Sequence, residues 1–184
     1  PAEVGSGTLA APAALPTMDP QLATAHFPPL LSGFDLRSMP VLRTDVLVIG
    51  GGIAGSSAAL HAAAAGAEVL LLGKSPFDET NTAWAQGGIA AAQRADDSLE
   101  LHEQDTLRVG TGLSDRGTVR AVVEGARDAL DWLQGLGAQF DRDGSALALS
   151  REGGHTCARV VHAGGDCTGA EIQRALLAAV EAHP

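Results

Sequence analysis

The sequence contains only two cysteines, one lysine and no long hydrophobic run. Cys157 and Cys167 are too few for a disulfide scaffold, and their spacing does not fit a zinc site, so we expect no bound metal. We predict that both are buried thiols in a protein of the reducing cytoplasm. His61 and Glu68 interrupt the longest apolar stretch, which leaves no segment of membrane-spanning length.

Basic residues are also scarce. The net charge is therefore −10, and the isoelectric point lies near 4.8. This balance argues against a nucleic-acid backbone as a partner. The single lysine, Lys74, directly follows an apolar segment, where it is a candidate ligand for a phosphate or ribose oxygen. A solvated lysine at the end of a strand is the alternative. With 184 residues, 45% hydrophobic and 18% charged, the chain is long enough for one soluble globular domain.

The first forty or so residues lack charged pairs at helical spacing, strand alternation and the pattern of a signal peptide. They are rich in alanine and proline, and we expect residues 1–43 to be a flexible extension. Met39 stands just ahead of the first expected strand. We hypothesise that Met39 is the natural start, which a native peptide from upstream of it would contradict.

The most informative stretch is residues 44–55, TDVLVIGGGIAG. An apolar strand at 46–49 is followed by three glycines at G-x-G-x-x-G spacing and then by a helix-forming segment over 56–65. Gly66 is placed to end this helix, and residues 68–72 form a second apolar strand. This order predicts a β-α-β unit that binds a dinucleotide.

Each glycine of the motif has an expected task. Gly50 permits the tight turn, Gly52 allows close approach of a pyrophosphate, and Gly55 allows the helix to pack on the strand. The start of the helix offers free N–H groups to the phosphates. A plain β-α-β unit with a tight turn is the alternative. The carboxylate that grips ribose in nicotinamide enzymes is missing, because Gly73 ends the second strand.

The rest of the chain reads as helices and short strands around two polar loops. Residues 73–89 form a long loop, which at this length is expected to be functional. Caps at Asp97-Ser98 and Ser114-Asp115 predict helices that end at Val109 and near Gly135 and Gly137. Short strands are expected at 138–141 and 146–149, joined by an Asp143-Gly144 turn, with a short apolar run at 160–161. Thr168 is predicted to cap a last helix over 170–182.

No further strand follows this last helix, although a doubly wound sheet requires more strands. The sequence therefore predicts an α/β fold. Its core is a Rossmann-like β-α-β unit with helical and loop insertions, and its doubly wound sheet is left incomplete by truncation. We expect residues 44–184 to be part of a larger nucleotide-binding domain.

Three further segments carry a specific resemblance. They are residues 81–92 (NTAWAQGGIAAA), residues 151–155 (REGGH) and residues 162–169 (HAGGDCTG). Together with the glycine motif, they resemble the aspartate oxidase branch of the flavoprotein family that also contains succinate dehydrogenase and fumarate reductase. The resemblance covers roughly residues 44–184.

The resemblance implies FAD rather than NAD as the cofactor. The respiratory members bind flavin covalently through a histidine in the loop, whereas the matching residue here is Asn81, so FAD is expected to be held non-covalently. The cofactor-binding residues that it implies are Gly50, Gly51, Gly52, Ile53, Ala54, Gly55, Lys74, Asn81, Thr82, Ala83, Trp84, Ala85, Gln86, Gly87 and Gly88.

The resemblance also implies a substrate and one catalytic residue. In the aspartate oxidases the glutamate of the REGGH motif faces the amino group of the substrate, and this maps to Glu152. The implied reaction is oxidation of L-aspartate to iminoaspartate, with oxygen or fumarate as electron acceptor, on the route to quinolinate and NAD. Quinolinate synthase is thereby a candidate partner. His155 and His162 are alternatives for substrate or cofactor binding, although structural roles are expected for both.

The capping domain, the C-terminal helical domain and the arginines and histidines that bind the substrate carboxylates are implied to lie beyond Pro184. The isolated chain is therefore expected to show little activity. A succinate or fumarate enzyme of the same family is one alternative, and a nucleotide-binding module without catalysis is another. A nicotinamide dehydrogenase fragment is disfavoured by Gly73 and by the loop at 81–92.

Overall fold

The computed structural model describes residues 41–183. The predicted extension over 1–43 therefore lies outside the described residues apart from its last three positions, which are exposed and form no helix or strand. Met39, the hypothesised start, also lies outside them.

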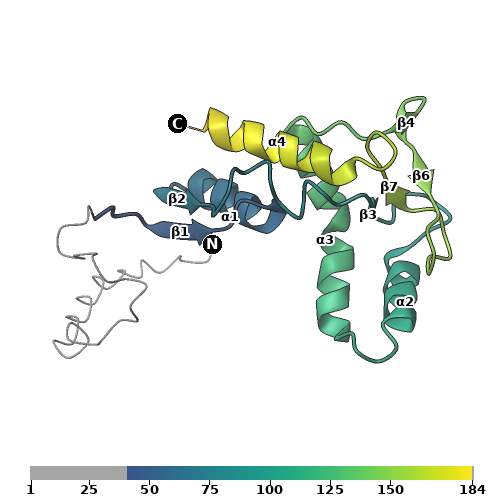
Figure 1. The fold of residues 1–184 in the computed structure, drawn as a ribbon. Helices are drawn as coiled ribbons and strands as arrows, with labels where there is room; N and C mark the ends of the chain where they lie inside the picture. Colours follow the sequence, from purple (N-terminus) through teal and green to yellow (C-terminus); the bar gives the residue numbers. More distant parts are fainter. Residues whose placement is uncertain (1–40, 184) are drawn as a thin grey trace, which may run out of the picture. The chain divides into compact units, whose positions relative to one another are not determined.

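A parallel strand pair with a crossover helix opens the described chain. Strands β1 (Val46–Ile49) and β2 (Val69–Leu72) pair in parallel, and α1 (Ile53–Ala64) connects them (Figure 1). The predicted β-α-β unit is confirmed, although α1 begins at Ile53 rather than at Ser56. The helix ends as expected, since the N–H of Gly66 donates to the carbonyl oxygen of Ala63 at 2.9 Å.

Two helices, α2 (Leu99–Val109) and α3 (Arg116–Gly135), pack against each other (Figure 1). Both begin at the predicted caps. The Ser98 hydroxyl accepts a hydrogen bond from the N–H of Leu101, and the Asp115 carboxylate accepts one from Thr118. Each side chain satisfies one of the amide donors that a helix start leaves unpaired.

A small antiparallel sheet follows, in the order β3 (Ile89–Ala90), β7 (Val160–Val161) and β6 (Leu149–Ser150). Strands β4 (Arg142–Asp143) and β5 (Ala146–Leu147) form a hairpin in the predicted region, but its first strand lies at 142–143 and includes Asp143, which was expected in the turn. The strand expected over 138–141 was wrong, because this segment is held by single contacts instead of a ladder. One of them is the carboxylate of Asp141, which accepts hydrogen bonds from the N–H groups of Gly164 and Gly165.

The last helix, α4 (Thr168–Ala182), packs against α1. The predicted Thr168 cap was wrong: Cys167 occupies the cap position and makes no capping hydrogen bond. The Thr168 hydroxyl instead accepts a hydrogen bond from Ala163, so it braces the preceding turn. One face of α4 contributes to a buried cluster formed by Ala91, Leu130, Leu133, Ala138, Phe140, Val161, Ala163, Ile172, Ala175 and Leu176.

The prediction of two buried thiols was also wrong. Both cysteines are free, but Cys157 is only partly buried and Cys167 is exposed. Cys167 lies in the turn that leads into α4, where the chain is at the surface. Among residues 41–183, no helix is both long and apolar enough to cross a membrane.

Candidate functional site

The glycine turn has the geometry that the motif predicts. Gly50 adopts φ +115°, a conformation that residues with a Cβ rarely adopt, and its N–H donates to the carbonyl oxygen of Leu72 at 2.7 Å. A Cβ on Gly55 would collide with the carbonyl oxygen of Gly50. The turn and the first helical turn are therefore packed as closely as the backbone allows.

A cleft of about 310 Å³ lies over this turn. Six of the predicted site residues line it: Gly50, Gly51, Gly52, Lys74, Asn81 and Thr82. Within residues 41–183, the N–H groups of Gly51 and Gly52 and the amino group of Lys74 make no hydrogen bond. The cleft thus presents two unused amide donors and one cationic side chain, a donor set that fits the pyrophosphate of a dinucleotide.

The loop after β2 closes the other side of the cleft. The Thr82 hydroxyl accepts a hydrogen bond from the N–H of Ile53 at 3.0 Å, so the first amide of α1 is not free for a phosphate, contrary to expectation. The Thr80 hydroxyl accepts one from Ala83 at 3.1 Å. Farther along, Trp84 is 79% exposed, and the carbonyl oxygen of Ala85 accepts the N–H of Gly169.

The end of this loop lies against the second sheet. A Cβ on Gly88 would collide with the carbonyl oxygen of Val161 in β7. Gly88 and Ile53 also line a second cavity of about 900 Å³, which is bounded largely by α3. The remaining predicted residues lie in α1 and in the loop without lining either cavity: Ala54, Gly55, Ala83, Trp84, Ala85, Gln86 and Gly87.

Glu152 is brought close to Gly88 through His162. Oε1 of Glu152 lies 3.2 Å from Nε2 of His162 and 3.3 Å from the hydroxyl of Ser150. The ring of His162 in turn lies 3.1 Å from the position that a Cβ on Gly88 would occupy. Both contacts of the glutamate use Oε1, and Oε2 has no hydrogen-bond partner among the described residues.

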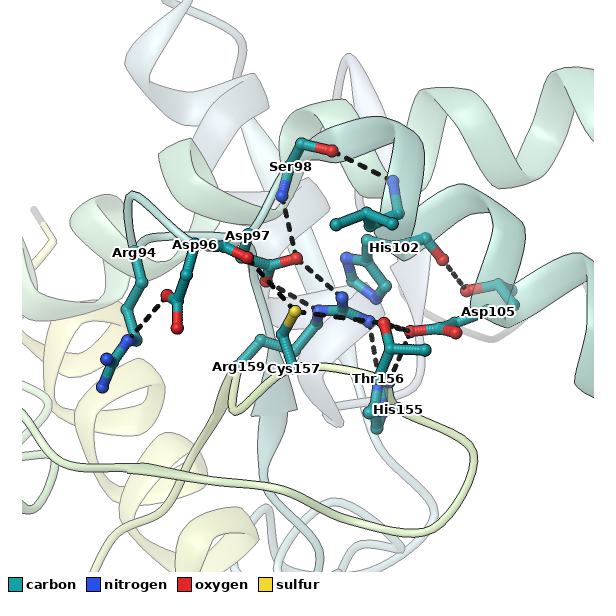
Figure 2. Close-up of polar contacts among 12 residues, drawn as sticks. Arg94, Asp96, Asp97, Ser98, His102, Asp105, His155, Thr156, Cys157 and Arg159 are labelled. Carbon is teal, nitrogen blue, oxygen red and sulfur yellow. Dashed lines mark hydrogen bonds and ion pairs between the residues drawn. The ribbon is translucent and has the colours of Figure 1, made fainter.

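A buried ion cluster anchors the loop that follows Glu152 (Figure 2). The side chain of Arg159 is completely buried between Asp97 and Asp105. Its guanidinium donates to both oxygens of Asp97 at 2.7 and 2.8 Å, and to Oδ2 of Asp105 at 2.7 Å. This two-pronged geometry suits a planar guanidinium and a carboxylate.

The cluster fixes the charge of both carboxyl groups. The hydrogen bond from Arg159 lowers the pKa of Asp97 despite burial. Burial opposes ionisation of Asp105 as well, but hydrogen bonds from Thr156, Arg159 and Arg108 outweigh it and hold its pKa well below the usual range. Conversely, burial and the nearby Arg159 lower the pKa of His102, which favours a neutral imidazole.

The same carboxylates tie the loop to α2. Oδ2 of Asp105 accepts hydrogen bonds from the N–H and the hydroxyl of Thr156, at 2.8 and 2.9 Å. Arg108 donates to the carbonyl oxygen of Gly154 at 2.8 Å, and Arg159 lies 3.0 Å from Nδ1 of His155. His155 therefore contacts the ion cluster, and the loop carrying Glu152 is held from its C-terminal side.

Sequence reasoning missed three residues that contact the predicted site segments or the ion cluster: Arg159, Gln173 and Gly169. Arg159 directly precedes a buried apolar pair, Val160-Val161, and a charged residue there was a signal of a buried ion pair. Gln173 lies on the same stripe of α4 as Gly169, Ile172 and Leu176, so a polar side chain among buried positions was the signal. Nothing in the spacing indicated that Gly169 contacts the loop after β2.

Comparison with known proteins decides the family. The FAD binding domain family matches residues 45–184. The chain belongs to this family. The predicted cofactor, FAD, and the predicted flavoprotein resemblance and fold class are thereby confirmed.

The chain is similar in sequence or in structure to several named proteins. The chain is 48% identical over 143 residues to an L-aspartate oxidase of Streptomyces coelicolor, which covers 77% of this chain and 25% of that protein. The structure matches Mycobacterium smegmatis Sdh1 with a TM-score of 0.71 and 38% identity, covering 74% of this chain and 23% of that one. It matches quinol fumarate reductase FrdA of E. coli with a TM-score of 0.74 and 27% identity, covering 79% and 25%. The chain thus spans about a quarter of the length of the curated relatives it matches.

Proposed function

We propose that this chain is the FAD-binding part of an L-aspartate oxidase, a flavin-dependent oxidoreductase that converts L-aspartate to iminoaspartate. The names of the relatives support this activity, and the geometry of Glu152 is the observation that carries it. One oxygen of the glutamate is anchored by His162 and Ser150, while the other has no partner among the described residues.

The residues of the cleft fit the cofactor. In this proposal the unused N–H groups of Gly51 and Gly52 donate to phosphate oxygens and Lys74 supplies a positive charge, which is supported by the position of all three residues in the lining of one cleft. Asn81, an amide at the cleft wall, is the residue that we expect to leave FAD non-covalently bound. The rest of the implied set, from Thr82 to Gly88, forms the loop that we propose runs along the flavin. When bound, FAD accepts the hydride that the substrate loses.

Glu152 gives the site a means of selecting aspartate. A carboxylate with one free oxygen forms a charge-assisted hydrogen bond with the ammonium group of aspartate. Succinate has no ammonium group and carries the same two carboxylates, so the glutamate repels it without compensation. Oxygen or fumarate as acceptor, quinolinate synthase as partner and a cytoplasmic location stay predictions.

The experiment that tests this function begins with an absorbance spectrum of the purified protein before and after acid precipitation. We expect a flavin band that moves to the supernatant. A band that remains with the pellet would show covalent attachment and contradict the interpretation of Asn81. A colourless protein that takes up no added FAD would contradict cofactor binding by this chain alone and leave it as a module that needs further sequence.

The substrate is then tested with the native gene product loaded with FAD. We expect anaerobic L-aspartate to bleach the flavin band and succinate to leave it unchanged. Glu152→Gln should slow bleaching by aspartate, whereas Glu124→Gln, an exposed carboxylate on α3 paired with Arg120, should not. The structural match to quinol fumarate reductase FrdA favours a succinate or fumarate enzyme of the same family as the second candidate. Bleaching by succinate alone would establish that candidate instead.

A further inference from the structure

Gln173 of α4 is a buried amide whose hydrogen-bonding groups reach segments far away in the sequence. The residue is only 3% exposed. Its Nε2 donates to the carbonyl oxygens of Gly51, at 2.8 Å, and Phe77, at 2.6 Å, and its Oε1 accepts the hydroxyl of Thr80 at 3.0 Å. Both amide hydrogens are therefore used. The partners belong to the glycine turn and to the opposite wall of the cleft.

The bond to Gly51 sets the direction of a neighbouring donor. A second donor, the hydroxyl of Ser56 in α1, reaches the same carbonyl oxygen at 3.0 Å. The carbonyl of Gly51 and the N–H of Gly52 belong to one planar trans peptide, so they point in opposite directions. Holding the carbonyl toward α1 and α4 therefore turns the Gly52 N–H, which has no partner among the described residues, away from both helices.

The other two bonds order the wall that faces the turn. Phe77 and Thr80 both line the cleft, and the hydroxyl that Thr80 donates to Gln173 also accepts the N–H of Ala83. This segment leads directly into Asn81 and Thr82. One buried amide thus fixes the relative placement of the two sides of the cleft, although Gln173 itself does not line it.

We propose that Gln173 is a positioning residue for the FAD pyrophosphate, acting through the Gly51–Gly52 peptide and the 77–80 segment. This role rests on the proposed use of the cleft by FAD. Loss of the amide removes one buried partner from two carbonyl oxygens and one hydroxyl, and leaves the Ser56 hydroxyl as the one described donor that still holds the Gly51 carbonyl, so the peptide is held less firmly. The consequence is weaker binding of the phosphates, beyond any loss of overall stability.

The test compares Gln173→Leu with Ile172→Val in the same chain. The leucine variant keeps the size of the side chain and removes all three hydrogen bonds. Ile172 is also buried in α4 but lies in the hydrophobic cluster, so its variant lowers stability without touching the cleft. FAD affinity is measured by quenching of flavin fluorescence. We expect the dissociation constant to rise roughly tenfold in Gln173→Leu and to stay unchanged in Ile172→Val.

Hydrogen exchange, measured without FAD, provides an independent readout. We expect faster exchange at residues 50–53 and 77–83 in Gln173→Leu, with α2 and α3 unchanged. Thr80→Val removes the hydroxyl bonded to Oε1 and keeps both bonds of Nε2, so it serves if the leucine variant does not fold, and it should speed exchange at residues 77–83.

Unchanged FAD affinity in a folded Gln173 variant would overturn the proposal, as would unchanged exchange in both segments. A loss of affinity that Ile172→Val reproduces would reduce Gln173 to a structural role. If the parent chain binds no FAD, cofactor binding by this chain fails, and the exchange measurement still decides whether Gln173 orders the cleft.

Discussion

Replacing Arg159 by methionine removes the positive charge from the buried ion cluster. Methionine fills a similar space, but Asp97 and Asp105 then stay buried without the guanidinium that neutralises their charges. Removal of one partner from a buried ion pair costs about 3–5 kcal/mol, because the charge left behind is desolvated and unpaired. A domain of ordinary stability has about 5–15 kcal/mol in total, so the variant is expected to fold but to be fragile.

The loss should depend on pH with a defined sign. In the parent chain the pKa of Asp97 is lowered, so its contribution to stability is complete above the unfolded pKa, roughly 4, and is lost as the pH falls. In Arg159→Met, Asp97 keeps the hydrogen bond from the N–H of Ser98, but burial is then the larger effect and raises its pKa instead. The variant's stability should then increase as the pH falls from 7 to 5, while Asp105 keeps its bonds to Thr156 and Arg108.

Urea unfolding followed by circular dichroism measures both effects. Arg94→Met is the matched control, because Arg94 pairs with Asp96 in the same region but at the surface (Figure 2). Its loss should be below about 1 kcal/mol. Adding Asp97→Asn to Arg159→Met should recover about 1–3 kcal/mol. A deficit in Arg159→Met that matches the surface control, or that is the same at pH 5 and pH 7, would refute this account of the cluster.

Two glycine substitutions test the packing of the helices. Gly55→Ala should lower stability by about 1–3 kcal/mol and abolish FAD uptake, because its Cβ collides with the carbonyl oxygen of Gly50. Uptake is measured by flavin absorbance, and normal uptake would contradict the observed turn. Gly125→Ala should raise the free energy of unfolding by about 0.5–1 kcal/mol, because Gly125 lies inside α3 with no atom within 4 Å of the added Cβ; a lower urea midpoint would show an unseen contact.

The parts of the fold that sequence could predict were those set by local chemistry. The glycine spacing after β1 and the side-chain caps at Ser98 and Asp115 act within a few residues, so their signals are contiguous. The segment 138–141 has the composition of a strand, but its partners are isolated groups on separate segments, among them Glu171 and the turn at 162–165, and strand propensity carries no information about them. Thr168 failed as a cap for a similar reason, since its hydroxyl was already used by Ala163.

In the candidate site, too, features set by nearby residues could be predicted, and contacts with distant segments could not. Lys74 and Asn81 line one cleft with the glycine turn, and this could be anticipated because Lys74 lies just after β2 and Asn81 lies in the loop that follows it. The contribution of α4 could not be predicted, because it depends on how a helix about a hundred residues away packs against that turn. A buried glutamine signals that polar partners exist, but only the fold determines that these are the carbonyl oxygens of Gly51 and Phe77.

The hydrogen bond between Gln173 and Gly51 has a consequence for synthesis of the chain. The two residues are 122 positions apart. At translation rates of about 5–20 residues per second, roughly 6 to 24 s pass between their incorporation. During that interval the nascent chain already contains the glycine turn but has no amide to hold its carbonyl. The cleft is therefore completed only after most of the described chain has been made.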